Sequence, residues 1–244
     1  MTDWLGRRSN LVFAACCGLL VAIKFLFETF PGDFPAKGQA EAFTWPIVWA
    51  IIGVGLLGLL AERSLRFPDA FDDLRLERRG QLLAAATGLA YGVLTLVQDR
   101  FASGGGNPLT LTEWPHVAWP WSVPFYTFGA IFLELLLRLG LLCLLVWLVH
   151  VVILQRRRLM PVFWVVNALV SFYETMPATL VHVARGEWGA VALTPLEPLY
   201  WTNLFEGWLL LRFGWFAPIV LRFAFYLVWH IIYGGLGPYD VRLH

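Results

Sequence analysis

Two charged side chains lie near the middle of a long apolar run over residues 125–152, where Glu134 and Arg138 are four positions apart. On an α-helix this spacing places a carboxylate and a guanidinium on one face, one turn apart. Each charge costs roughly 2.5–3.5 kcal/mol at the centre of a bilayer unless it is paired and turned inward. The pair therefore indicates either a functional site inside a membrane or a structural ion pair that fixes the register of the helix.

The composition of the chain favours a membrane protein. Apolar residues make up 59% of its 244 residues and charged residues only 14%, whereas soluble domains have about 45–50% and about 25%. We therefore predict an all-α fold, a polytopic transmembrane helical bundle. The net charge of +1 and the lack of a Gly-rich phosphate loop give no indication of a nucleic-acid partner.

The few metal-binding residue types do not form a recognisable site. The three cysteines lie inside apolar runs, so we predict buried thiols rather than disulfides or metal ligands: Cys16, Cys17 and Cys143. His116 stands alone in a polar connection, where a histidine is expected to be incidental. We expect no cofactor and no metal.

Seven apolar runs are long enough to be considered as membrane spans. They cover residues 11–27, 45–60, 82–97, 124–154, 161–182, 198–211 and 215–233. Arg7 and Arg8 before the first run resemble the start of a signal peptide, but the run continues too far, which favours a retained first helix. The charged segment 61–80 is expected to lie on the membrane surface as a loop or partly interfacial helix.

The positive charges predict the orientation of the bundle. Arginines gather in alternate connections: Arg7 and Arg8; Arg63, Arg66, Arg75, Arg78 and Arg79; Arg156, Arg157 and Arg158; and Arg212. The positive-inside rule then places the N-terminus in the cytoplasm and the C-terminus outside, in a membrane that we take to be the bacterial inner membrane.

Four ionisable residues fall at one depth in these spans. Counted from the helix ends, Glu134, Glu174, Glu206 and Arg222 lie roughly 8–12 residues from the outer face, at about 1.5 Å per residue. We predict that they form one internal cluster, with ion pairs Glu134–Arg138 and Glu174–Arg222. Glu206 would then be neutral or hydrogen-bonded. Three further polar residues are expected beside the cluster as supporting groups: Asn203, Tyr226 and Asn167.

Three stretches of the chain resemble the CPBP family of intramembrane proteases, which includes the CAAX-processing and Abi proteins. The family's Glu-Glu-x-x-x-Arg motif is matched by Leu133-Glu134 and Arg138. Its Phe-x-x-x-His motif is matched by Val170 and Glu174. The resemblance covers roughly residues 120–235, and it divides the chain into an N-terminal three-span region, 1–119, and a CPBP-like four-helix core, 120–244.

The third motif of the family is a helix, a short turn and a second helix with His-x-x-x-Asn. Gly207, Gly214 and Pro218 follow that pattern, while Arg222 stands at the His position and Tyr226 at the Asn position. The resemblance implies an intramembrane endopeptidase whose first Glu acts as general base, a role that needs a carboxylate within reach of water. Leu133 cannot supply one, although Arg222 could stabilise an oxyanion.

Two functions follow from these departures, and a third stays open. The protein is either catalytically degenerate, acting as a binding or accessory subunit of a membrane complex, or an active glutamic-type protease in which Glu174 is the base. A transporter is the third possibility, but the chain has no internal repeat. Expected partners are membrane lipid and another membrane protein or peptide, contacted in part by tryptophans: Trp114, Trp119, Trp121, Trp188 and Trp201.

Overall fold

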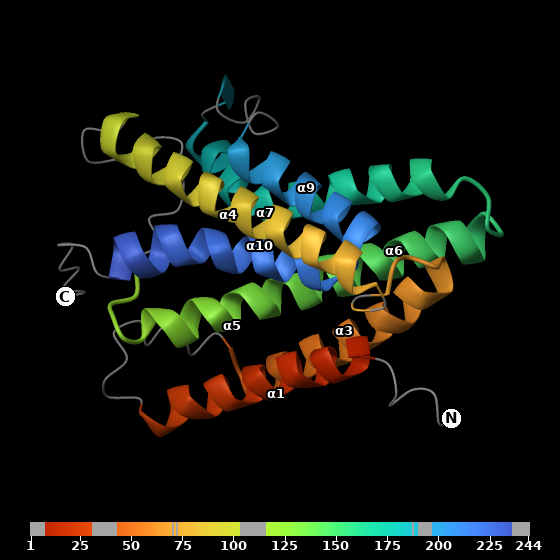
Figure 1. Ribbon diagram of the computed structural model, residues 1–244. Helices are drawn as coiled ribbons and strands as arrows, with labels where there is room; N and C mark the ends of the chain where they lie inside the picture. The colour runs from red at the N-terminus through yellow and green to blue at the C-terminus, as the bar shows by residue number, and fades with distance from the viewer. Residues whose placement is uncertain are drawn as a thin grey trace.

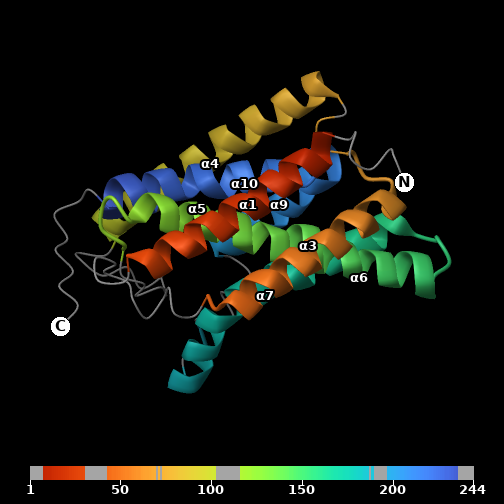
Figure 2. The same cartoon turned by 90° about the horizontal axis from the view of Figure 1, so that it is seen from below.

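A computed structural model describes residues 8–30, 43–69, 71, 73–102, 116–186, 188–189 and 197–235. This part of the chain consists of helices and connections, without a strand. The helices run lengthwise beside one another in a single elongated bundle (Figures 1 and 2). The prediction of an all-α helical membrane bundle is therefore confirmed. Arg7 and Trp114 lie outside the described residues.

The bundle contains α-helical and π-helical segments. In chain order they are α1 (Arg8–Thr29), α3 (Trp45–Leu65), α4 (Leu74–Ala102), α5 (Ser122–Glu134), η1 (Leu135–Leu142), α6 (Cys143–Trp147), η2 (Leu148–Ile153), α7 (Leu159–Arg185), α9 (Pro198–Phe213), α10 (Phe216–Tyr226) and η4 (Leu227–Gly234). The segments from α5 to η2 follow one another without a break, as do α10 and η4. Of the three π-helical segments in the described residues, two begin directly after a predicted site residue, Glu134 or Tyr226.

The number of long apolar helices is smaller than predicted. Six described helices are long and apolar enough to cross a membrane. The predicted span 198–211 forms α9, whose 16 residues extend about 24 Å, which is short of a hydrocarbon core of about 30 Å. The count of seven full spans is corrected to six, with α9 packed between α7 and α10 in the bundle (Figure 1).

The charged segment 61–80 does not form one interfacial helix. Arg66 adopts a left-handed backbone conformation, φ 60°, that ends α3, and Pro68 follows it. Asp73 then starts α4, because its Oδ1 accepts hydrogen bonds from the backbone N–H groups of Arg75 and Leu76 at 2.9 and 3.2 Å. The segment is thus divided between two helices and a short connection.

Glycines allow two pairs of helices to approach closely. A Cβ atom at Gly58 of α3 would collide with the backbone of Leu139 in η1, and one at Gly88 of α4 would collide with the backbone of Leu221 in α10. Gly53 faces outward, and a Cβ atom added there would have no atom within 4 Å. Gly58 therefore serves close packing of α3 against η1, as small residues do between membrane helices.

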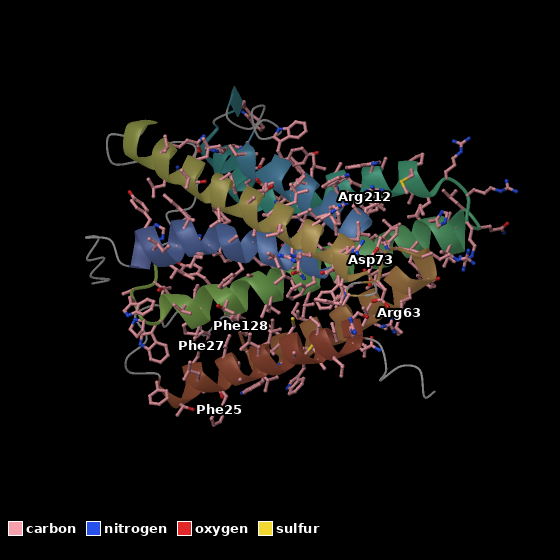
Figure 3. The ribbon with its side chains drawn as sticks, viewed as in Figure 1. Phe25, Phe27, Arg63, Asp73, Phe128 and Arg212 are labelled. Carbon is pink, nitrogen blue, oxygen red and sulfur yellow. The ribbon has the colours of Figure 1, made fainter. Side chains whose placement is uncertain are left out.

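Alternation between buried and exposed aromatic residues fixes how α1 lies on the bundle. Phe27 is 5% exposed and its ring lies 6.1 Å from that of Phe128 on α5, whereas Phe25 is 63% exposed. Figure 3 shows Phe27 turned toward Phe128 and Phe25 turned away from the bundle. The predicted thiols are present as free cysteines, with Cys16 and Cys143 buried and Cys17 half-buried.

Candidate functional site: a buried glutamate–arginine cluster

Five charged side chains from four parts of the bundle meet in its interior. Glu134 ends α5 and Arg138 follows in η1, while the others come from α7, α9 and α10: Glu174, Glu206 and Arg222. We call these five residues the glutamate–arginine cluster. The structure thus brings together the four ionisable residues that the sequence places at one depth, along with Arg138, the predicted partner of Glu134.

Arg222 lies at the centre of the cluster. Its Nη1 and Nη2 atoms donate hydrogen bonds to the two carboxylate oxygens of Glu174 at 2.6 and 3.0 Å. Its Nε donates to Oε1 of Glu134. Nη2 also lies within bonding distance of Oε2 of Glu206, at 2.8 Å, and of Oδ1 of Asn203, at 3.2 Å. One guanidinium therefore contacts all three carboxylates, using the fork of N–H donors that a lysine lacks.

Arg138 is paired mainly across helices rather than along its own. Its Nη2 lies 2.8 Å from Oε2 of Glu206 and 3.5 Å from Oε2 of Glu174. The predicted pair with Glu134 is a 3.9 Å contact, the longest in the cluster. Arg138 lies in a π-helical segment, in which residue i bonds to i+5 instead of i+4. This wider turn displaces Arg138 from the position that α-helical spacing predicts.

The hydrogen-bond partners of Glu206 differ from those that the sequence predicted. Its Oε2 accepts hydrogen bonds from both arginines, at 2.8 Å each, rather than from Asn203 or Tyr226. With all five side chains ionised, three carboxylates and two guanidiniums leave one formal negative charge. The bidentate Glu174–Arg222 pair agrees with the predicted pairing.

The cluster is almost completely removed from solvent. Glu134, Arg138 and Glu206 are at most 1% exposed and Arg222 is 4% exposed. The Glu174 side chain, at 13%, is the most accessible of the five. Desolvated charges are costly, so each must gain partners inside the protein. The shared hydrogen bonds provide those partners.

The three predicted supporting residues have different surroundings. Asn203 accepts a hydrogen bond from Arg222 within the cluster. Asn167 lies beside it and links α7 to α9, because its Nδ2 donates to the backbone carbonyl of Leu204 at 3.0 Å. Tyr226 lies one turn after Arg222, with its ring 5.5 Å from that of Tyr126. Asn203 therefore contacts the cluster directly, whereas Asn167 joins two of the helices that carry the cluster.

Several buried polar atoms around the cluster have remaining hydrogen-bonding capacity. They are Oε2 of Glu134, Nε and Nη1 of Arg138, Oδ1 of Asn167, Oγ of Ser171 and Nδ2 of Asn203. Donors and acceptors from three neighbouring helices are combined in this set, which suits small polar molecules such as internal water. In the described part of the chain, no group of three His, Cys, Asp or Glu side chains is arranged to hold a metal ion.

His116 stands alone in the sequence, but in the structure it contacts another histidine. Sequence spacing could not predict this contact. The Nδ1 of His116 lies 3.2 Å from Nδ1 of His230 in η4, and the ring of His230 stacks on Tyr126 with centroids 4.2 Å apart. The two histidines are separated by 114 positions. Only the packing of the connection before α5 against η4 brings them together.

Replacing Asn167 by Leu is expected to lower the free energy of unfolding by about 1–3 kcal/mol. The change leaves the partly buried carbonyl of Leu204 without its side-chain donor. Ser171→Ala is the matched control, because Ser171 lies one turn along the same helix and its buried Oγ has no hydrogen-bond partner among the described residues. Denaturant unfolding in detergent micelles measures both variants. Equal losses would contradict a role for the Asn167–Leu204 hydrogen bond.

The cluster is thus a set of three carboxylates paired with two arginines. Comparisons with protein-family models, with curated proteins and with solved structures give no match for this chain.

Proposed function

We propose that this integral membrane protein has a CPBP-like architecture, is catalytically degenerate, and acts as a binding or accessory subunit of a membrane complex. The membrane assignment follows from the six long apolar helices. The observation that carries the rest of the proposal is the position of Arg222, whose guanidinium contacts Glu134, Glu174 and Glu206 together.

This geometry favours a structural cluster over a hydrolytic centre. A general base must accept a hydrogen bond from the attacking water, directly or through one more water molecule. Both oxygens of Glu174 are engaged by Arg222, and Oε2 of Glu206 is engaged by two arginines. The position before Glu134, where the resembling family has its first glutamate, is Leu133. Glu174 and Glu206 therefore serve the arginines rather than a water nucleophile.

Two observations favour an active glutamic-type protease as the second candidate. Glu174 is the most accessible cluster residue, with a side chain 13% exposed, and Oε2 of Glu134 has no hydrogen-bond partner in the described part of the chain. A water molecule held between these two carboxylates would have a base beside it, and Arg222 could then stabilise an oxyanion. This candidate differs from the first in one testable respect, because it requires Glu174 for cleavage.

Exposed indoles support the binding part of the proposal. Trp119, Trp188 and Trp201 are 55%, 66% and 57% exposed. Tryptophan combines a large apolar area with an N–H donor, so it suits contacts with a protein partner at the level of the lipid headgroups. Expected partners are another membrane protein or a membrane peptide, in addition to the surrounding lipid.

Partner recovery combined with a cleavage assay tests the proposed function. Wild type, Glu174→Gln and the control Glu28→Gln would each be purified in mild detergent and incubated with the membrane proteins that co-purify. Glu28 is a suitable control because it pairs with Lys24 at the end of α1, away from the cluster. We expect a stoichiometric partner that all three proteins leave uncleaved. A cleavage product formed by wild type and Glu28→Gln, but not by Glu174→Gln, would contradict the proposal in favour of the protease.

A further inference from the structure

A second polar region lies at one end of the bundle, apart from the cluster. Here a cavity of about 410 Å³ opens between the end of α3, the start of α4 and the end of α9. This volume lies within the range of about 300–1,000 Å³ that is usual for small-ligand sites. Its charged lining consists of Arg63, Arg66, Asp69, Asp73 and Glu77.

The cavity lies where two candidate membrane spans meet the aqueous phase. One span ends at Leu65 and the next begins at Leu74, so the residues between them are at the level of the lipid headgroups. Figure 3 shows Arg63 and Asp73 toward the same end of the bundle as Arg212. Apolar side chains, Phe67 and Phe213, line the cavity beside the charged ones. The site therefore offers both polar and apolar contacts at a membrane surface.

The charged side chains that line the cavity differ in how many hydrogen bonds they make within the protein. Arg63 donates to Asn10 of α1 through Nη2, whereas the exposed Arg66 guanidinium makes no hydrogen bond or ion pair within the described residues. Glu77 is buried and accepts hydrogen bonds from Gln81 at 2.9 Å and from a backbone N–H at 3.3 Å. The cavity thus combines a fixed carboxylate with a guanidinium that is available to a ligand.

Asp73 provides a second available group. Its Oδ1 is used to cap α4, and its Oδ2 has no partner in the part of the chain that the structure describes. A ligand that satisfies Arg66 and Asp73 together must carry an anion and a cation a few bonds apart. A purely anionic ligand would meet three carboxylates, and a purely cationic one would meet two arginines.

We propose that this cavity binds the headgroup of a phosphatidylethanolamine molecule from the surrounding bilayer. The phosphate pairs with Arg66 and Arg63, because guanidinium groups match phosphate oxygens with two parallel hydrogen bonds. The primary ammonium donates hydrogen bonds to Asp73 and its neighbouring carboxylates, while Phe67 and Phe213 contact the glycerol region. Phosphatidylcholine lacks these N–H donors and phosphatidylglycerol lacks the positive charge, so the site favours phosphatidylethanolamine over both.

Lipid retention measures this preference. The full-length protein would be reconstituted in an equal mixture of phosphatidylethanolamine, phosphatidylcholine and phosphatidylglycerol, and the bound lipids would be counted by native mass spectrometry. We expect wild type to retain phosphatidylethanolamine over the other two. Arg66→Gln and Asp73→Asn, which keeps the capping oxygen, should each weaken that preference about three- to fivefold. Arg212→Gln, an exposed arginine that does not line the cavity, should leave it unchanged.

Three outcomes would overturn the proposal. They are equal retention of the three lipids by wild type, a preference for phosphatidylglycerol, or an unchanged preference in both cavity variants. Free phosphoethanolamine is included as a competitor, and displacement by it without any lipid preference would assign the cavity to a soluble zwitterion instead. The comparison among lipids on the wild-type protein keeps the test decisive even if a cavity variant folds poorly.

Discussion

Arg222→Met is expected to lower the free energy of unfolding by about 3–5 kcal/mol, the cost of leaving buried charge uncompensated. Arg222 contacts three glutamates, two of which are at most 1% exposed. Removing it leaves Arg138 as the one remaining cation in the cluster. Methionine fills part of the same volume, so the loss reports charge rather than a cavity. Denaturant unfolding in detergent micelles provides the measurement.

Two further variants separate this effect from general damage. Arg222→Lys should recover only part of the loss, because an ammonium cannot form the bidentate contact with Glu174 while it also reaches Glu134 and Glu206. Arg212→Met, at an exposed position on α9, should have little effect. A stable Arg222→Met protein would show that the cluster is not held together by this guanidinium.

Gly58→Val is expected to be the second strongly destabilising substitution, with a loss of about 1–3 kcal/mol or more. A side chain at Gly58 would overlap the backbone of Leu139 and Gly140 in η1, and backbone atoms cannot move aside as a flexible side chain can. Helix α3 would have to separate from η1, the segment that carries Arg138. The loss would be measured by the same unfolding experiment.

The matched control for Gly58 lies on the same helix. Gly53 is exposed and has no atom within 4 Å of an added Cβ atom. Gly53→Val makes the same chemical change five positions away, so it should leave stability nearly unchanged. Equal effects at the two positions would mean that helix propensity, rather than the contact between α3 and η1, causes the loss.

The sequence predicted the helices of the fold and the meeting of the charged residues in its interior. Long apolar runs predicted the helices because backbone groups in a membrane must be hydrogen-bonded within the segment. The common depth of Glu134, Glu174, Glu206 and Arg222 predicted that they meet, because unpaired charges at that depth are costly. Both inferences use quantities that can be counted along the sequence: the length of an apolar run and the distance of a residue from the end of its helix.

The pairing inside the cluster could not be predicted in the same way. Helical spacing paired Glu134 with Arg138, but the shift to π-helical turns after Glu134 left them 3.9 Å apart. The contact between Glu134 and Arg222 joins residues separated by 88 positions, so it depends on how α5 and α10 pack. The number of full spans was overestimated for a related reason, since apolar composition does not distinguish a full span from a shorter helix packed in the bundle, such as α9.

The architecture explains why so many charges are tolerated in one place. Each of the four contributing helices carries a single acid or base into the interior, apart from the continuous helix that carries Glu134 and Arg138. Helices α7, α9 and α10 each lack an opposite charge of their own in the cluster, so their charges are paired only when the helices meet. We expect the cluster to specify how α5, α7, α9 and α10 assemble, a role known for some buried polar groups.

A double-mutant cycle between Arg222 and Glu174 tests the central claim most directly. The stabilities of wild type, Arg222→Met, Glu174→Gln and the double variant would be measured under the same conditions. Because the two side chains form a bidentate buried pair, we expect a coupling energy of about 1–3 kcal/mol, with the double variant more stable than the sum of the single losses predicts. A coupling energy near zero would contradict this expectation, because it would mean that Glu174 and Arg222 do not stabilise the protein through each other.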